Sequence, residues 1–312
     1  MTAPEHARAA SPQPEWVRRP ERSSMAMLRL MTWISLRLGR APARLVLAGI
    51  SLYFLLFAPA ARAASRLYLR QALGRTPRFA DQYRHFHSFA SIIHDRVFLL
   101  NARFDLFDVS VHGEEVIKEV LAAGRGAFLM GAHLGSFEAV RAIGRRQPGL
   151  RVAMVMYEEN ARKLNAALAA INPAAVEDIV PLGQLDSMLR VQACLDEGMV
   201  LGVLGDRSLG DDPTLRVPFL GKLADFPLGP MRLAAMLKRP VLFMSGLYLG
   251  RNRYAIHFER LADFSDIDRT ERAAAIEAAV RVYAACLERH CRATPYNWFN
   301  FFDFWRLKGT RP

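Results

Sequence analysis

Short uninterrupted apolar runs alternate, from about residue 115 onward, with stretches whose apolar residues recur at helical spacing. Continuous apolar runs of a few residues are typical of strands that are buried on both faces. The predicted strands are Ala127–Ala132, Val152–Tyr157, Ile179–Leu182 and Met199–Leu204. The helices predicted between them are Ser136–Arg146, Ala161–Ala170 and Leu185–Glu197. This alternation predicts a layered α/β fold with a mostly parallel sheet and flanking helices.

The last third of the chain follows a different pattern. A proline in the first turn, preceded by Gly229, predicts a helix at Pro230–Leu237. Two longer apolar segments, Val241–Leu249 and Tyr254–Arg260, indicate a hairpin that turns near residues 251–253. A long helical pattern then covers Arg269–Cys291.

The region before this alternation is apolar and rich in arginine. Met25–Arg40 is one predicted helix, and Leu45–Ala61 runs for 17 residues without a charge between Arg44 and Arg62. Such a length is at the short end of what crosses a bilayer. Apolar helices flanked by arginines suit a lipid interface with anionic headgroups. The alternative is a pair of helices buried against the domain, and we favour membrane association.

The net charge of +12, from 42 basic and 30 acidic side chains, is unevenly distributed. Residues 1–78 hold 13 arginines and three glutamates, so the rest of the chain is almost neutral. A nucleic-acid-binding protein would spread basic residues over its folded surface, so we expect no nucleic-acid partner. We divide the chain into a disordered basic tail at 1–24, membrane-associating helices at 25–78 and an α/β domain at 79–312.

Cysteines and histidines give no metal signature in the sequence. The three cysteines, Cys194, Cys286 and Cys291, have neither metal-ligand spacing nor a disulfide framework, which indicates a reducing compartment. Three histidines near the N-terminal region have no thiolate or carboxylate cluster beside them, and we interpret them as core or surface residues. They are His85, His87 and His94. We therefore expect no metal and no cofactor.

Two polar segments, 133–138 and 205–207, directly follow predicted strands, where the reactive groups of parallel sheets collect. Ser136 is a plausible N-cap, which places Glu138 in the first turn of the following helix. Because His133 lies in the loop, the two side chains can fold back into contact. A carboxylate that fixes one imidazole nitrogen leaves the other free as a general base. The alternative is a structural histidine that caps the strand end.

The segment GAHLGSFEAVR, with His133 and Glu138 five positions apart, resembles the H-x4-D/E signature of the lysophospholipid acyltransferase superfamily. Its setting is similar to the branch that contains the bacterial lipid A biosynthesis lauroyl and myristoyl acyltransferases. The supporting blocks are GRGAFLMGAHLGSFEA at 124–139, LGDRS at 204–208, VPFLGK at 217–222 and FPLGPMRLA at 226–234. The resemblance covers roughly residues 25–305 and implies a glycerol-3-phosphate acyltransferase-like α/β fold.

The chain departs from the lipid A branch at two places. Tyr157 is followed by Glu158 and Glu159 where that branch usually has Tyr-Arg. The ending YNWFNFFDFW at 296–305 looks more like an acyltransferase group found with aryl-polyene pigment pathways. We interpret these dense aromatic residues as a last segment that docks on the domain. An acyl-binding wall or a lipid-interface belt is the alternative.

The resemblance implies roles for individual residues. His133 would deprotonate an acceptor hydroxyl, and Glu138 would orient and stabilise the imidazolium. The oxyanion would be held by backbone N–H groups near Gly135 and Ser136, or by the Arg207 guanidinium. Asp206 and Arg207 would form a binding pair, with a strand-end ion pair as the alternative. Two aromatic residues are core residues or line an acyl groove, namely Phe137 and Tyr157.

The function implied is transfer of a fatty or polyene acyl group from an acyl carrier protein or coenzyme A thioester. The acceptor would be a hydroxyl of a membrane lipid or glycolipid, at the cytoplasmic face of the inner membrane. Basic residues after the motif, Arg141, Arg145 and Arg146, would meet the acidic carrier protein. A catalytically silent membrane-bound carrier of lipid or polyene is the alternative function.

Overall fold

The computed structural model describes residues 25–144, 151–172, 179–183, 186–208 and 212–306. A seven-stranded sheet forms the centre of the fold, and all its strand pairs are parallel except β8 with β9. In spatial order the strands are β1 (Asp108–His112), β9 (Arg253–Asp263), β8 (Pro240–Gly250), β2 (Ala127–Gly131), β5 (Val200–Leu204), β3 (Val152–Tyr157) and β4 (Ile179–Leu182). The predicted α/β class, four predicted parallel strands and the hairpin are therefore confirmed.

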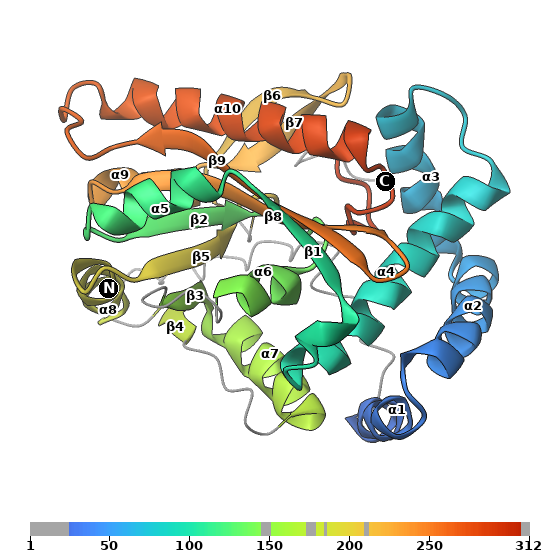
Figure 1. The fold of residues 1–312 in the computed structure, drawn as a ribbon. Coiled ribbons are helices and arrows are strands. Elements are labelled where there is room, and N and C mark those ends of the chain that lie inside the picture. Colours follow the sequence, from blue (N-terminus) through green and yellow to red (C-terminus); the bar gives the residue numbers. More distant parts are fainter. Residues whose placement is uncertain (1–24, 145–150, 173–178, 184–185, 209–211, 307–312) are drawn as a thin grey trace, which may run out of the picture.

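Helices cover both faces of the sheet (Figure 1). They are α5 (Glu114–Ala122), α6 (Phe137–Gly144), α7 (Glu158–Ile171), α8 (Ser187–Asp196), α9 (Gly229–Met236) and α10 (Arg272–Ala293). Phe128 and Met130 of β2 pack into the core that α10 covers, whereas Leu129 packs with α5 and α6 on the opposite face. Burial on both faces explains why this strand is apolar at every position.

A second, two-stranded antiparallel sheet consists of β6 (Thr214–Phe219) and β7 (Lys222–Pro227). The sequence pattern did not predict this hairpin or the edge strand β1. Val217, Phe219 and Phe226 of the hairpin are buried in the core beneath α10. The hairpin therefore extends the wall of that core.

In the described part of the chain, four α-helices precede the sheet: α1 (Met25–Leu38), α2 (Arg40–Phe57), α3 (Pro59–Leu73) and α4 (Phe79–Leu100). We expected the apolar segment Leu45–Ala61 to form one helix. It is instead divided after Phe57. Ala58 is non-helical (φ −119°, ψ 72°) and Pro59 opens α3. A proline disfavours helical geometry in the residue before it, so the break follows from the sequence.

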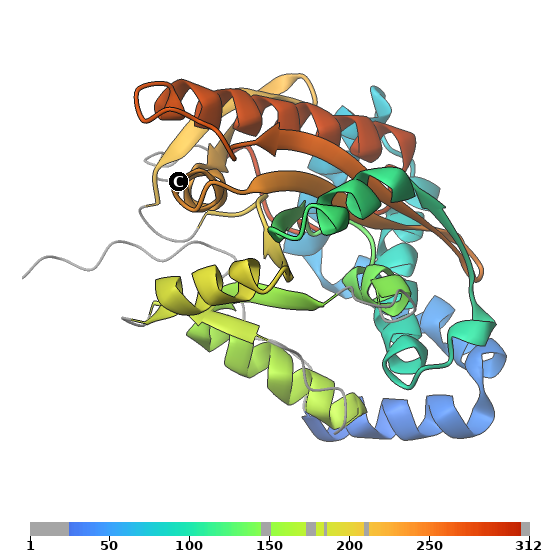
Figure 2. The same ribbon diagram turned by 60° about the vertical axis from the view of Figure 1, so that its left-hand side comes forward.

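Helix α2 has one face on the protein and the other exposed. Leu47, Ser51 and Leu55 recur every four residues and are buried, and α2 packs beside α4. Of the described helices, only α2 is long and apolar enough to cross a membrane, and 17% of it is buried. Figure 2 shows α1, in dark blue, running past α7 at the outside of the fold.

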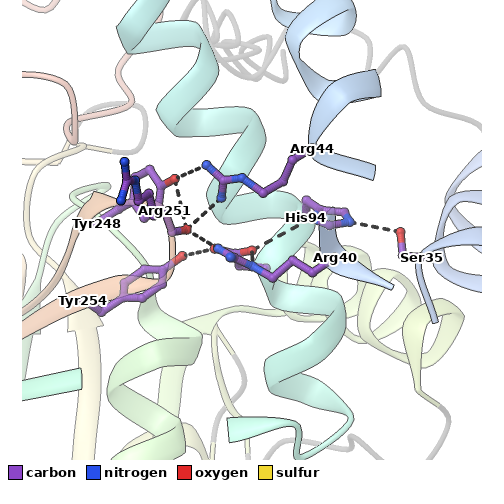
Figure 3. A network of polar contacts seen from close by, with 8 residues as sticks. Ser35, Arg40, Arg44, His94, Tyr248, Arg251 and Tyr254 are labelled. Atoms are coloured by element: carbon purple, nitrogen blue, oxygen red, sulfur yellow. Dashed lines mark hydrogen bonds and ion pairs between the residues drawn. The ribbon is translucent and has the colours of Figure 1, made fainter. Parts of the chain in front are cut away.

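A polar network fastens α2 to α4 and to the β8–β9 turn (Figure 3). The Arg40 guanidinium donates to both carboxylate oxygens of Asp95 at 2.7 and 2.8 Å, and the Tyr254 hydroxyl donates to Asp95 at 2.8 Å. Arg44 donates to the carbonyl of Arg251 at 2.7 Å. Arg40, at the start of α2, therefore contacts the protein and does not face lipid headgroups.

Candidate active site

The carboxyl ends of β2 and β5 lie side by side because the two strands are parallel neighbours. Gly131 is the register partner of Leu204, and the Gly205 N–H donates to the Gly131 carbonyl at 3.0 Å. The two polar segments that the sequence placed after these strands therefore meet. His133 and Asp206 come together at this edge of the sheet.

The imidazole of His133 is held by Asp206. Its Nδ1 lies 2.9 Å from Asp206 Oδ1, and its backbone N–H donates to Asp206 Oδ2 at 3.0 Å. The side chain is 30% exposed, and Nε2 has no hydrogen-bond partner among the described residues. Burial lowers the pKa of His133 and the Arg207 charge lowers it further, while Asp206 opposes both. A neutral imidazole with an accepting Nε2 is the form that a general base needs at neutral pH.

Asp206 is fully buried in a cradle of donors. Besides the His133 N–H, its Oδ2 accepts from Trp298 Nε1 and from Asn300 Nδ2, each at 3.0 Å. Burial alone would raise the pKa of this carboxyl, but contacts with His133 and the Arg207 charge lower it well below its usual range. Asp206 is therefore ionised, and it is more than a strand-end ion-pair partner of Arg207.

Glu138 lies in the first turn of α6. We had expected its carboxylate to hold the His133 imidazole, but it does not contact it. The Ser136 hydroxyl accepts from the Ala139 N–H at 3.2 Å, which confirms the predicted N-cap. The carboxylate of Glu138, 5% exposed, pairs with Arg96 Nε of α4 at 2.6 Å. Among the described residues, Asp206 is the carboxylate beside His133 Nδ1, because the pairing of β2 with β5 places the ends of these two strands next to each other.

The backbone N–H groups that we considered as oxyanion donors are already engaged. Gly135 N–H donates to the Asn297 carbonyl at 2.8 Å, and Ser136 N–H donates to the Gly246 carbonyl at 2.7 Å. Gly135 has φ 71°, a conformation that favours glycine, and it lies against β8. These two N–H groups fix the loop on β8 and the C-terminal segment, so the alternative donor, Arg207, remains.

The Arg207 guanidinium lies close to His133 and Asp206. Its Nε donates to Asn300 Oδ1 at 2.7 Å, and its guanidinium carbon lies 5.3 Å from the centre of the Phe302 ring. Burial lowers the pKa of Arg207 to about 10, opposed by the charge of Asp206, so the side chain stays positive at neutral pH. A fixed positive charge close to His133 can stabilise developing negative charge.

The two predicted groove aromatics differ in position. Phe137, at the start of α6, packs against the core between the sheet and α5, as a core aromatic does. Tyr157, at the end of β3, is 41% exposed, so it is not a core residue. Of the basic residues expected to meet a carrier protein, Arg145 and Arg146 lie outside the described residues.

The C-terminal aromatic segment docks on the domain, as predicted, and it completes the site. Trp298 is fully buried, and its backbone forms an antiparallel β-bridge with Leu134. The Phe299 N–H donates to the His133 carbonyl at 2.8 Å. Sequence reasoning missed Asn297, Trp298 and Asn300 as site residues, although their block was noted for its density of aromatics. It also missed Arg96, which no pattern distinguishes from other helix arginines.

Of the three histidines expected to be core or surface residues, His85 and His94 are buried in the core and His87 is half-buried. His85 is fully buried and contacts the Ser65 hydroxyl and the Trp298 carbonyl, each at 2.9 Å, while His94 contacts the Ser35 hydroxyl at 3.1 Å. Within the described residues, His133 and Asp206 do not belong to a group of metal-ligand side chains.

Comparison with known proteins shows the family of this chain. The family model described as bacterial lipid A biosynthesis acyltransferase matches residues 89–307. A comparison with curated proteins finds no match. Among solved structures, the chain is similar to the 1-acyl-sn-glycerophosphate acyltransferase PlsC from Thermotoga maritima, at 17% identity and a TM-score of 0.37 over 78% of this chain and 96% of that chain. Since the family model spans well over half of the chain, this protein belongs to the bacterial lipid A biosynthesis acyltransferase family and is an acyltransferase of lipid biosynthesis.

Proposed function

We propose that this acyltransferase moves a fatty or polyene acyl group from a carrier-protein or coenzyme A thioester to a hydroxyl of a membrane lipid or glycolipid. The observation that carries the proposal is the contact of His133 Nδ1 with the buried Asp206 carboxylate, while Nε2 has no hydrogen-bond partner among the described residues and can accept a proton. The sequence contains no Gly-x-Ser-x-Gly nucleophile elbow, which supports direct attack by the acceptor hydroxyl.

The proposed reaction runs through His133. Nε2 takes the proton of the acceptor hydroxyl, and the oxygen attacks the thioester carbonyl to form a tetrahedral oxyanion. Asp206 stabilises the imidazolium by accepting from Nδ1–H, and Arg207 supplies positive charge near the oxyanion. The C–S bond then breaks, and Nε2 returns the proton to the thiolate. The products are an ester and a free thiol.

We further propose that the protein works on the cytoplasmic face of the inner membrane, with α2 lying in the interface. Its inner face packs on α4, so the helix lies along the body rather than leaving it. Its outer face exposes large apolar side chains, among them Leu45, Tyr53 and Phe57. Arg62 and Arg66 of α3 are exposed beside it and can meet anionic headgroups.

The test measures thiol release and ester formation by the purified protein with membrane lipid and either an acyl carrier protein or a coenzyme A thioester. We expect His133→Ala to abolish both products, whereas the matched control His112→Ala, at an exposed position of β1, stays at the wild-type rate. Wild-type turnover by His133→Ala would refute the mechanism. Thioester binding without any product by the wild type would instead favour the silent carrier.

A further inference from the structure

A second group of reactive side chains lies away from His133, between β9 and α10. His257 and Glu259 are two positions apart on β9, so they point to the same face of the strand. His290 of α10 lies over them, with Nε2 2.6 Å from Glu259 Oε1. One ligand atom from each of these three residues lies within 4.8 Å of the others.

The surroundings of this group are also of the type that metals bind. Cys286 is one helical turn before His290 on α10, and both are 6% exposed. The Phe243 ring stacks on the His290 imidazole with ring centres 5.1 Å apart, which fixes its plane. His112 of β1 is the register partner of His257 and stacks on it at 4.6 Å.

We propose that His257, Glu259 and His290 form a zinc site, with the Cys286 thiolate or a water as the fourth ligand. Two imidazoles and a carboxylate are a ligand set that Zn²⁺ takes in proteins. The sequence showed no metal spacing because the ligands come from a strand and from a helix about 30 residues later. Cys286 and His290 do have a C-x3-H spacing on one helix face.

Metal binding requires a small and defined rearrangement. Ligand atoms about 2.0–2.1 Å from a tetrahedral zinc lie about 3.4 Å from one another, so the His290–Glu259 contact must open by roughly 0.8 Å. The Nε2 proton of His290 leaves to solvent as Zn²⁺ takes its place. Arg289 pairs with the other oxygen of Glu259 and acts as a competing cation. Its removal should therefore strengthen zinc binding.

The site would brace the C-terminal segment rather than take part in acyl transfer. Helix α10 ends at Ala293, and Asn297, Trp298 and Asn300 follow directly. Trp298 and Asn300 hold Asp206. A metal that joins the last turns of α10 to β9 would therefore stabilise the scaffold of the catalytic pair.

The test titrates chelator-treated full-length protein with Zn²⁺ alone, in competition with a chromophoric chelator, and records the thermal unfolding midpoint. We expect one saturable equivalent and a raised midpoint, since a ligand that binds only the folded state stabilises it. His257→Ala and His290→Ala should each weaken binding at least about tenfold, the control His87→Ala on α4 should keep it, and Arg289→Ala should strengthen it several-fold.

Absence of saturable binding, or equal binding in the wild type and in both His257→Ala and His290→Ala, would overturn the proposal. Circular dichroism shows whether each variant is folded. Should His290→Ala unfold, Glu259→Gln replaces it, because the amide keeps the size of the side chain but loses the charge that zinc needs. Zinc binding by Glu259→Gln at wild-type strength would equally refute the site.

Discussion

The variant Asp206→Asn tests which carboxylate, that of Asp206 or that of Glu138, orients His133. Three donors converge on Oδ2 of Asp206: the His133 N–H, Trp298 Nε1 and Asn300 Nδ2. In the variant these donors retain the amide oxygen at that position, so the amide NH₂ faces His133 Nδ1. It then donates to Nδ1, which moves the imidazole proton to Nε2. Nε2 can no longer accept the proton of the acceptor hydroxyl.

The expected loss follows from removing a positioned general base. Such a base contributes ~10²–10⁴ in rate, which corresponds to about 3–5 kcal/mol of transition-state stabilisation. Because Asn fills the same buried volume and keeps the three donors satisfied, the unfolding midpoint should change little. The defect should therefore appear in kcat rather than in the amount of folded protein.

The assay follows ester formation under saturating thioester and acceptor, with Asp225→Asn as the matched control. Asp225 pairs with Arg216 on the β6–β7 hairpin, away from His133, and its variant should turn over at the wild-type rate. Turnover of Asp206→Asn within tenfold of the wild type would refute the orienting role. A larger loss in Glu138→Gln than in Asp206→Asn would return that role to Glu138.

Four further predictions concern other side chains of the structure and the dependence on pH. Glu138→Gln leaves the contact of His133 Nδ1 with Asp206 in place but removes the charge partner of Arg96. It should therefore lower kcat less than Asp206→Asn does, and lower the unfolding midpoint more. Calorimetry and the kinetic assay check these two effects. Arg40→Met leaves the fully buried Asp95 without its guanidinium and should cost roughly 3 kcal/mol of unfolding free energy, whereas Arg37→Met, at an exposed position, should cost almost none in the same denaturant titration. The activity should be constant above pH 6.5 and fall in acid as His133, whose pKa is lowered, takes up a proton; a rate that still rises steeply between pH 7 and 8 would contradict a neutral His133. Folding stability should also fall in acid. Burial lowers the pKa of His85 and of His94 to about 4, so the unfolded chain binds more protons than the folded one between pH 4 and 6.5. Stability is therefore lost as the pH falls through that window, which a series of thermal unfolding midpoints checks.

The sequence predicted those strands best whose two faces are both buried. β2, β3 and β5 contain only apolar residues and glycine apart from a terminal Tyr157, because they lie inside the sheet, where helices cover both faces. β1 reads DVSVH and lies at the sheet edge, where every second residue is exposed, so its pattern is short and polar. No apolar run marks such a strand.

The site was predicted only in part, for a reason of topology. Glu138 is five positions from His133, so proximity in the chain favoured it as the partner. Asp206 is 73 positions away and reaches His133 because β5 is the parallel neighbour of β2. Strand order is set by packing of the whole sheet, which no local pattern contains. The same holds for Asn300, which reaches Asp206 only after the chain has returned through α10.

The contact between the His133 loop and β8 makes a strand residue behave as part of the active site. A methyl group at Gly135 would lie 2.1 Å from the carbonyl oxygen of Gly246, and one at Gly246 would lie 2.3 Å from that of Ser136. Neither backbone can yield, because the loop is also tied to Asn297. A genetic screen for loss of acyl transfer should therefore recover alanine at Gly246, 113 positions from His133, as readily as changes in the motif itself.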